Sequence, residues 1–204
     1  MQVSKATLDK CEQMLDLAAE NNIRIIFSGP SAWEGTPDWA ESLKRDWHEY
    51  FTDELVLENL QYFYEVFTER FAEHPAIFSF DLFNEPYMVW NLPSRRDDWV
   101  KFLQERYVSL AELNRVWPDK NNVKKWRDIN IPSVENKRND QVIWDYQVFK
   151  NQLSKEFIDL CVNAIRKNDS NHLISIGTHQ GTVPFAAGKP DRYFAFDPHY
   201  LGDS

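Results

Sequence analysis

The chain has 204 residues, of which 15% are aromatic, and a formal net charge of −9 at pH 7. This length suffices for one domain with a real apolar core, and the 43% apolar content with only six glycines argues against disorder. The negative charge and the lack of a Lys/Arg stripe argue against nucleic acid as a partner. No apolar run approaches the roughly 18 residues of a membrane-spanning helix. Cys11 and Cys161 fall in helical patterns, so we expect buried free thiols.

Helical and strand patterns alternate along the chain. The helical patterns cover residues 4–21, 52–73 with Thr52 as N-cap, 97–107, a short helix opened by a Ser109/Glu112 capping box, and 140–167. The strand patterns cover residues 23–27, 77–83, 173–178 and 193–197. Such alternation indicates an α/β fold with a parallel sheet and helical crossovers.

The third strand pattern suggests which kind of parallel sheet this is. Ile174 and Ile176 face one way, whereas Ser175, Gly177 and then His179 face the other. Small residues inside and functional groups at the C-terminal rim are typical of a (β/α)₈ TIM barrel.

Four strands do not close a (β/α)₈ barrel, which usually has about 250 residues. We therefore expect the chain to be a central portion of a barrel, about strands 3–6. Residues 1–204 would then be a partial catalytic domain, with a helical insertion at about 87–138. By itself, this chain is expected to be inactive, because open barrel edges expose strands.

A carboxylate stands where the second strand stops. Pro86 has no N–H to give to a sheet, so the strand must end just before it, at Asn84-Glu85. Period two places Phe78, Phe80 and Leu82 on one face and Ser79, Asp81, Phe83 and Glu85 on the other. A lone Glu after a strand is more often an ordinary loop residue. A charged residue at the C-terminal end of a barrel strand, however, is typical of a catalytic group.

Two segments resemble a known superfamily. Phe80-Asp81-Leu82-Phe83-Asn84-Glu85-Pro86 resembles the fourth strand of the clan A retaining glycoside hydrolases, which include family 5 cellulases and family 42 β-galactosidases. The segment from Tyr107 to Trp117, with Leu113-Asn114, resembles the stretch that follows the acid/base loop in family 42. Trp126, Ile131-Pro132, Asp145-Tyr146 and Phe149 continue this likeness.

The resemblance implies a retaining O-glycosyl hydrolase that cleaves β-linked oligo- or polysaccharides, with no cofactor and no metal. Glu85 would be the general acid/base, and Asn84 would hydrogen-bond the sugar 2-hydroxyl. The last strand is similar to the sixth strand of the clan, where a His-x-Tyr pair lies beside the sugar. Here His199 and Tyr200 are adjacent and Leu201 stands at the usual Tyr position, so His199 is the firmer candidate.

Two further residues are candidates for sugar binding. Trp33 follows the first visible strand and could stack on a sugar, although packing is the competing interpretation. His179 lies at the rim after the third visible strand and would point into the same space. A retaining enzyme also needs a nucleophilic carboxylate about 5–5.5 Å from the acid. In clan A this group follows the seventh strand, so we expect the nucleophile to lie outside this chain.

Two other functions fit the pattern less well. A metal-dependent barrel hydrolase could use Glu85, His179 and His199 as ligands, but no His-x-His or His-x-x-x-His pattern accompanies them. Chelation that leaves activity untouched would exclude it. A non-catalytic carbohydrate-binding relative is the other alternative, and a Glu after the seventh strand would exclude that one.

Overall fold

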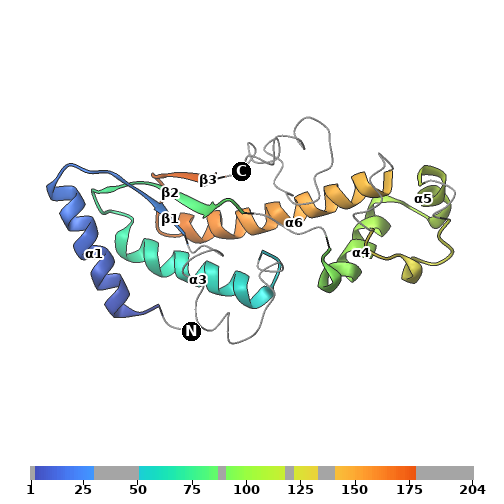
Figure 1. Cartoon of the computed structure of the whole chain (residues 1–204), viewed down its shortest axis with the longest axis horizontal. Helices are drawn as coiled ribbons and strands as arrows, with labels where there is room; N and C mark the ends of the chain where they lie inside the picture. The colour runs from blue at the N-terminus through green and yellow to red at the C-terminus, as the bar shows by residue number, and fades with distance from the viewer. Residues whose placement is uncertain (1–2, 30–50, 87–90, 118–121, 133–140, 178–204) are drawn as a thin grey trace. The chain divides into compact units, whose positions relative to one another are not determined.

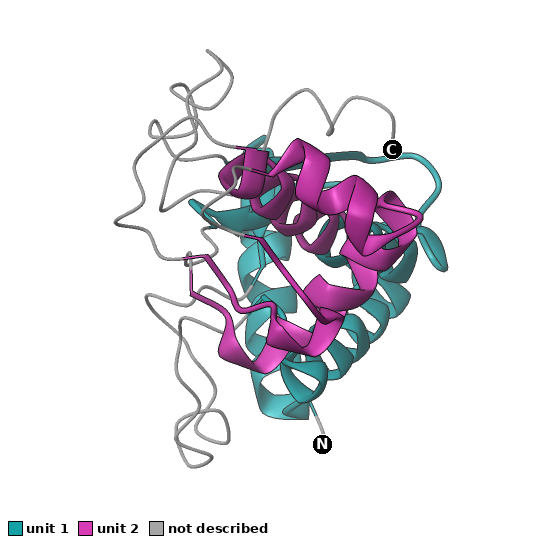
Figure 2. Cartoon of the chain, turned by 90° about the vertical axis from the view of Figure 1, so that its right-hand side faces the viewer, with its two compact units in different colours: residues 1–86, 156–179 teal, residues 87–155, 180–204 magenta. Residues whose placement is uncertain are grey.

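The structure is a computed structural model that describes residues 3–29, 51–86, 91–117, 122–132 and 141–177. The chain divides into two compact units (Figure 2). Unit 1 comprises Met1–Pro86 and Glu156–His179, and unit 2 comprises Tyr87–Lys155 and Gln180–Ser204. In the described part of the chain, no helix combines the length and the apolarity needed to cross a membrane.

Unit 1 contains a three-stranded parallel sheet in the order β1-β2-β3 (Figure 1). Its elements are α1 (Lys5–Glu20), β1 (Ile25–Ser28), α3 (Glu54–Phe71), β2 (Ile77–Asn84), β3 (Leu173–Gly177) and the last part of α6 (Gln141–Arg166). The predicted alternation and parallel pairing are thus confirmed for three strands. The predicted strand at 193–197 lies outside the described residues.

The N-terminal caps of two helices in unit 1 test the predicted helix boundaries. Ser4 caps α1 as its pattern suggests, with its side chain accepting from the Thr7 N–H. The predicted cap of the next helix, Thr52, is wrong: Asp53 caps α3, and its carboxylate accepts the Val56 N–H at 3.1 Å. A carboxylate also interacts favourably with the positive end of the helix dipole, whereas Thr52 is buried.

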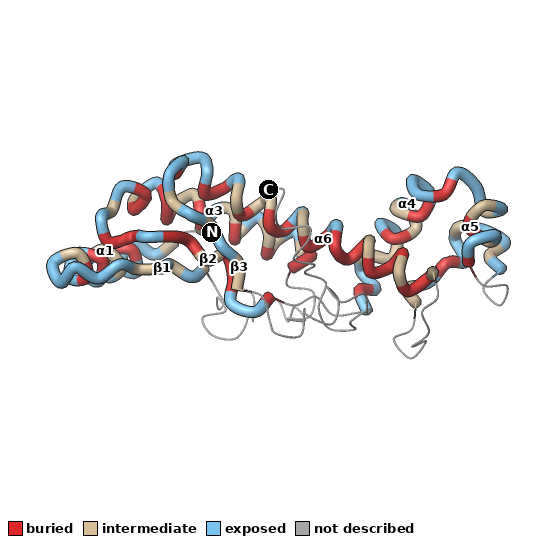
Figure 3. The backbone as a smooth tube through the Cα atoms, turned by 90° about the horizontal axis from the view of Figure 1, so that it is seen from above, coloured by how far each residue is buried: buried red, intermediate tan, exposed pale blue. Residues whose placement is uncertain are grey.

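Aromatic side chains hold α3 against one face of the sheet. The Phe67 ring of α3 lies 3.8 Å from that of Phe27 in β1 and 6.4 Å from that of Phe80 in β2, centroid to centroid. The buried Tyr64 hydroxyl donates to the Leu82 carbonyl at 2.6 Å. β2 carries most of the buried strand residues, and β1 and β3 are half-buried or exposed (Figure 3). The core of unit 1 therefore lies between α3 and the central strand.

Gly29 follows β1 at a point of close approach. A Cβ on Gly29 would lie 1.8 Å from the Tyr64 hydroxyl and 2.8 Å from the Leu82 carbonyl oxygen. The Gly29 N–H continues the sheet by donating to the Asp81 carbonyl at 2.9 Å. A larger residue here would displace the Tyr64 hydroxyl from its partner on β2.

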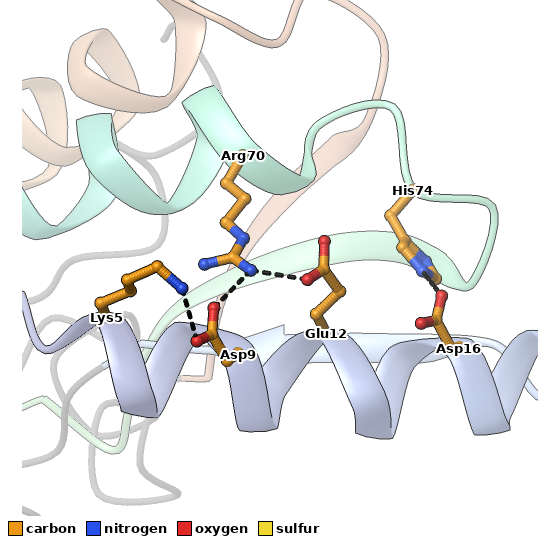
Figure 4. Close-up of polar contacts among 6 residues, drawn as sticks. All are labelled: Lys5, Asp9, Glu12, Asp16, Arg70 and His74. Atoms are coloured by element: carbon orange, nitrogen blue, oxygen red, sulfur yellow. Dashed lines mark hydrogen bonds and ion pairs between the residues drawn. The ribbon is translucent and has the colours of Figure 1, made fainter.

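An ion-pair cluster joins α1 to α3 and the turn after it (Figure 4). The Arg70 guanidinium donates to Asp9 at 2.8 Å and to Glu12 at 2.6 Å, and Lys5 also pairs with Asp9 at 2.8 Å. His74 contacts Asp16 at 3.2 Å. Lys5 and Asp16 are exposed and the other four side chains are partly exposed, so we expect a modest contribution of the cluster to stability.

The turn between α6 and β3 is organised by Asp169. Its side chain is 2% exposed and accepts the backbone N–H groups of Asn171 and His172, both at 2.9 Å. The His172 imidazole contacts the same carboxylate at 2.7 Å. Burial alone would raise the Asp169 pKa, but these hydrogen bonds outweigh it and lower the pKa. The ionised carboxylate is therefore the form that this turn requires.

We expect Asp169→Ala to lower the free energy of unfolding at pH 7 by about 1–3 kcal/mol, because the backbone N–H groups of Asn171 and His172 lose a charged acceptor. A carboxyl with a lowered folded-state pKa stabilises the protein above its ordinary pKa of 3.8, and this stabilisation is lost as the pH falls through the folded-state value. Urea unfolding at several pH values measures the difference between wild type and variant. That difference should shrink below about pH 4; a pH-independent difference would contradict this assignment.

Unit 2 contains α4 (Arg96–Arg106), α5 (Leu110–Val116), the first part of α6 and the 3-10 turns Pro93–Arg95 and Trp126–Asp128. The predicted Ser109 cap is confirmed at the start of α5, and Glu112 folds back on the residue before Ser109. Ser109 Oγ accepts the Glu112 N–H at 3.2 Å, and the Glu112 carboxylate accepts the Val108 N–H at 3.1 Å.

Asp145 is the polar centre of unit 2. Its side chain is fully buried and accepts from the Tyr107 hydroxyl at 2.6 Å and the Trp117 indole N–H at 2.8 Å. Gln141 donates to its other oxygen at 2.7 Å, and Arg106 lies 3.1 Å from it. Burial, and then the hydrogen bond to Asp145, raise the pKa of Tyr107 to about 12. One carboxylate thus ties α4, α5 and α6 together.

Both cysteines are free thiols, as expected. Cys161 is buried, and burial raises its pKa to about 12, whereas Cys11 is only half-buried.

Candidate active site

An irregularity in β2 sets the geometry of the candidate site. Asp81 pairs with Ser175 and Asn84 pairs with Gly177, so three residues of β2 span two of β3. Such a β-bulge breaks the alternation of side chains along the strand and bends it. The residues that follow the bulge therefore do not lie on the faces that strict period two predicts.

The placement of Phe83 on the polar face is therefore a wrong prediction. Phe83 is 1% exposed, and its ring lies 4.8 Å from that of Phe51 and 6.3 Å from that of Phe157 in α6. Because Asn84 is paired with Gly177, Asn84 takes the face that period two assigned to Phe83. The bulge buries the aromatic ring and brings the Asn-Glu pair to the strand end.

Glu85 is held by its backbone just beyond the last residue of β2. Its N–H donates to the Gly177 carbonyl of β3 at 2.7 Å, and its φ is 51°. A positive φ is uncommon for a residue other than glycine and costs about 1–3 kcal/mol, and such strain is enriched at functional sites. The side chains of Glu85 and Asn84 are exposed, whereas Pro86 is buried. The prediction that a carboxylate stands where this strand stops is confirmed.

A polar row crosses the three strands one step before the bulge. Ser28 of β1, Asp81 of β2 and Ser175 of β3 share one register position. The Asp81 carboxylate accepts the Ser28 hydroxyl at 3.3 Å and the Ser175 hydroxyl at 3.1 Å. Burial raises the pKa of Asp81, although hydrogen bonds from Ser175, Ser28 and the Gly177 backbone oppose this rise.

Period two places Asp81 on the polar face of the strand but does not assign it to the site. Ser28 and Ser175, each near the end of a neighbouring strand pattern, are the sequence feature that indicates a role for Asp81. In parallel strands, residues at matching positions lie side by side, so Ser28, Asp81 and Ser175 could have been read as one layer.

Of the predicted site residues, the structure describes Glu85 and Asn84 and brings them to one strand end. The others, Trp33, His179, His199 and Tyr200, lie outside the described residues. Within the described ranges there is no cluster of three or more His, Cys, Asp or Glu side chains that could hold a metal ion.

Three parallel strands with helical crossovers, and a Glu at the carboxyl end of the central strand, are consistent with part of a (β/α)₈ barrel. The chain belongs to glycoside hydrolase family 42: the family model described as β-galactosidase matches residues 43–188, more than half of the chain. The family resemblance noted in the sequence is thereby confirmed.

Solved structures of β-galactosidases match the fold of the chain. The cold-adapted enzyme of Rahnella sp. R3 and Gan42B of G. stearothermophilus each match with a TM-score of 0.71 and 17% identity over 83% of this chain. An exo-carrageenase of family 42 from Bacteroides ovatus matches with a TM-score of 0.61 and 17% identity over 86% of the chain. The chain spans 28% of the length of the first two and 26% of the third. A search of curated proteins gave no match.

Proposed function

We propose that this chain supplies the general acid/base of a retaining glycosidase that cleaves β-linked galactosides. The observation that carries the proposal is the position of Glu85. It follows the central parallel strand at its carboxyl end, and a hydrogen bond to Gly177 fixes its backbone. Membership of family 42 supports the reaction class, and the β-galactosidases among the matched structures support the sugar.

In this proposal the chain covers the middle of a (β/α)₈ barrel. β1, β2 and β3 are its third, fourth and fifth strands, and residues 193–197 form the sixth. Residues 87–138 form a helical insertion after the fourth strand. The strand order β1-β2-β3 and the small share of the matched structures that the chain spans support this assignment. The nucleophilic carboxylate then follows the seventh strand, outside the chain.

The reaction needs Glu85 in its protonated form for the first step and in its ionised form for the second. As an acid, Glu85 gives its proton to the glycosidic oxygen while the nucleophile attacks the anomeric carbon. As a base, it then takes a proton from the water that releases the sugar. Asn84 leaves the strand beside Glu85 and hydrogen-bonds the sugar 2-hydroxyl, a contact that strengthens in the transition state.

The remaining predicted residues bind substrate in this proposal. Trp33 offers a flat apolar ring to a sugar face, and His179, His199 and Tyr200 offer polar contacts from neighbouring strand ends. A retaining mechanism of this kind uses no metal, so a chelator should leave the rate unchanged.

The test is the stereochemistry of the first product. We expect the full-length protein to hydrolyse a nitrophenyl β-galactoside and to release β-galactose first, as followed by proton NMR before mutarotation. The α-galactoside of the same phenol is the matched control and should not react. Release of the α-anomer first would contradict a retaining mechanism, and binding without turnover would favour a non-catalytic carbohydrate-binding protein.

A further inference from the structure

The carboxylate of Asp81 collects hydrogen bonds from both neighbouring strands. It accepts the Ser28 hydroxyl of β1 at 3.3 Å and the Ser175 hydroxyl of β3 at 3.1 Å. It also lies against the backbone of Gly177, the last residue of β3, which favours its ionised form. The position of Gly177 agrees with this contact, since a Cβ built on Gly177 would lie 3.6 Å from Asp81 Oδ2. Asp81 is thus bound to the strand that also holds Glu85.

Gly177 contacts β2 on both sides of the bulge. Its backbone lies beside the Asp81 carboxylate, before the bulge, and its carbonyl accepts the Glu85 N–H at 2.7 Å, after the bulge. Between these two contacts lies the irregular stretch that ends β2. The position of the Glu85 backbone therefore depends on where Gly177 is held.

From this arrangement we propose that Asp81 is a positioning residue for Glu85, acting through the backbone of Gly177. The proposal rests on the acid/base role of Glu85 proposed above. A left-handed backbone in a residue with a side chain persists only where its surroundings hold it, and the hydrogen bond from Glu85 to Gly177 is the contact that does so. A charged acceptor beside the Gly177 backbone makes a stronger contact than a neutral one and so fixes this glycine more firmly.

A purely structural role for Asp81 makes a different prediction. A cross-link between strands would be served by the two serine hydroxyls, and its loss would loosen the whole sheet. If Asp81 positions Glu85, its loss should instead weaken mainly the backbone hydrogen bond of Glu85. The two roles can be separated by comparing the Glu85 amide with an amide at the opposite end of the sheet, such as Ile25, whose N–H donates to Ala76 at 2.7 Å.

Hydrogen exchange of the Glu85 and Ile25 amides, followed by NMR, is the backbone test. In Asp81→Ala we expect exchange at Glu85 to accelerate by about 10-fold or more relative to exchange at Ile25, because the local opening is selective. Ser175→Ala is the matched control, since it removes one hydroxyl donor and leaves the carboxylate on Gly177. Asp81→Asn keeps an oxygen acceptor and should restore much of the protection. Asp81→Leu, which is close to Asp in size but has no acceptor, replaces Asp81→Ala if the alanine variant does not fold.

Kinetics of the full-length protein provide a second test. Asp81→Asn should keep most of kcat on an alkyl β-galactoside, whereas Asp81→Ala should lower it by about 10- to 100-fold, the effect of a small misplacement of a catalytic group, with little change in KM. The loss on dinitrophenyl β-galactoside should be much smaller, because that leaving group needs no proton.

Equal acceleration at Glu85 and Ile25, or an unchanged Glu85 amide, would overturn the positioning role. An equal kinetic loss on both substrates would do the same. Failure of the proposed function would look different. It would appear in Glu85→Ala itself, as a loss of kcat that is the same for both leaving groups.

Discussion

Replacing Glu85 by alanine in the full-length protein is expected to lower kcat about 10²- to 10⁴-fold on an alkyl β-galactoside, the usual contribution of a positioned acid. A poor leaving group departs only when it is protonated, and the variant has no proton to give. On dinitrophenyl β-galactoside the first step should be largely spared, because the phenolate leaves unaided. Steady-state rates and the pre-steady-state burst on the two substrates measure this contrast.

Two matched variants make the Glu85 experiment specific. Glu85→Gln keeps the size of the side chain but cannot donate a proton in the same way, so it should resemble Glu85→Ala. Glu58→Ala removes an exposed carboxylate from α3 and should leave both rates unchanged. Equal loss on both substrates in Glu85→Ala would contradict the acid/base role.

Asp145→Ala is expected to destabilise unit 2 by about 3–5 kcal/mol, the usual cost of removing one partner from a buried charged network. The variant leaves the Tyr107 hydroxyl and the Trp117 indole N–H buried without their acceptor. Arg106 also loses the carboxylate that it contacts at 3.1 Å. Urea unfolding followed by tryptophan fluorescence reports this change, because Trp117 and the buried Trp99 both lie in unit 2.

Tyr107→Phe is the control for that measurement. It removes one donor while Asp145 keeps its contacts with Trp117, Gln141 and Arg106. We expect it to cost about 1 kcal/mol, the usual net value of one hydrogen bond. If Asp145→Ala cost no more than Tyr107→Phe, the central role assigned to Asp145 would be wrong.

The elements of the fold were largely predictable because their signals are local. Ser4 and Ser109 cap helices through contacts within their own first turns, and Pro86 ends β2. The cap of α3 was misassigned because Thr52 and Asp53 are both good caps, and only burial of Thr52 decides between them. Parallel pairing followed from the alternation of elements alone.

The candidate site was predicted less completely. The bulge in β2 depends on the register against β3, which no local pattern reveals, and it moved Phe83 into the core. The partners of Asp81 come from strands 53 and 94 residues away along the chain. Such contacts follow from tertiary pairing, so the sequence could place Glu85 at the strand end but could not show the polar row beside it.

The second segment that resembles the family contributes to the core of unit 2. Tyr107 and Trp117, which carry the likeness, both donate to Asp145 in the same unit. The likeness there falls on a buried hydrogen-bond network that ties three helices together, whereas the likeness around Glu85 falls on the end of a strand. The two segments support the same family for different physical reasons.

Trapping by azide tests the role of Glu85 most directly. In Glu85→Ala, azide can enter the space of the missing carboxylate and attack the glycosyl-enzyme without a general base. We predict that the full-length variant, given dinitrophenyl β-galactoside and azide, turns over faster and yields β-galactosyl azide, identified by NMR. Formation of α-galactosyl azide, or no azide product and no acceleration, would contradict the assignment of Glu85 as the acid/base of a retaining enzyme.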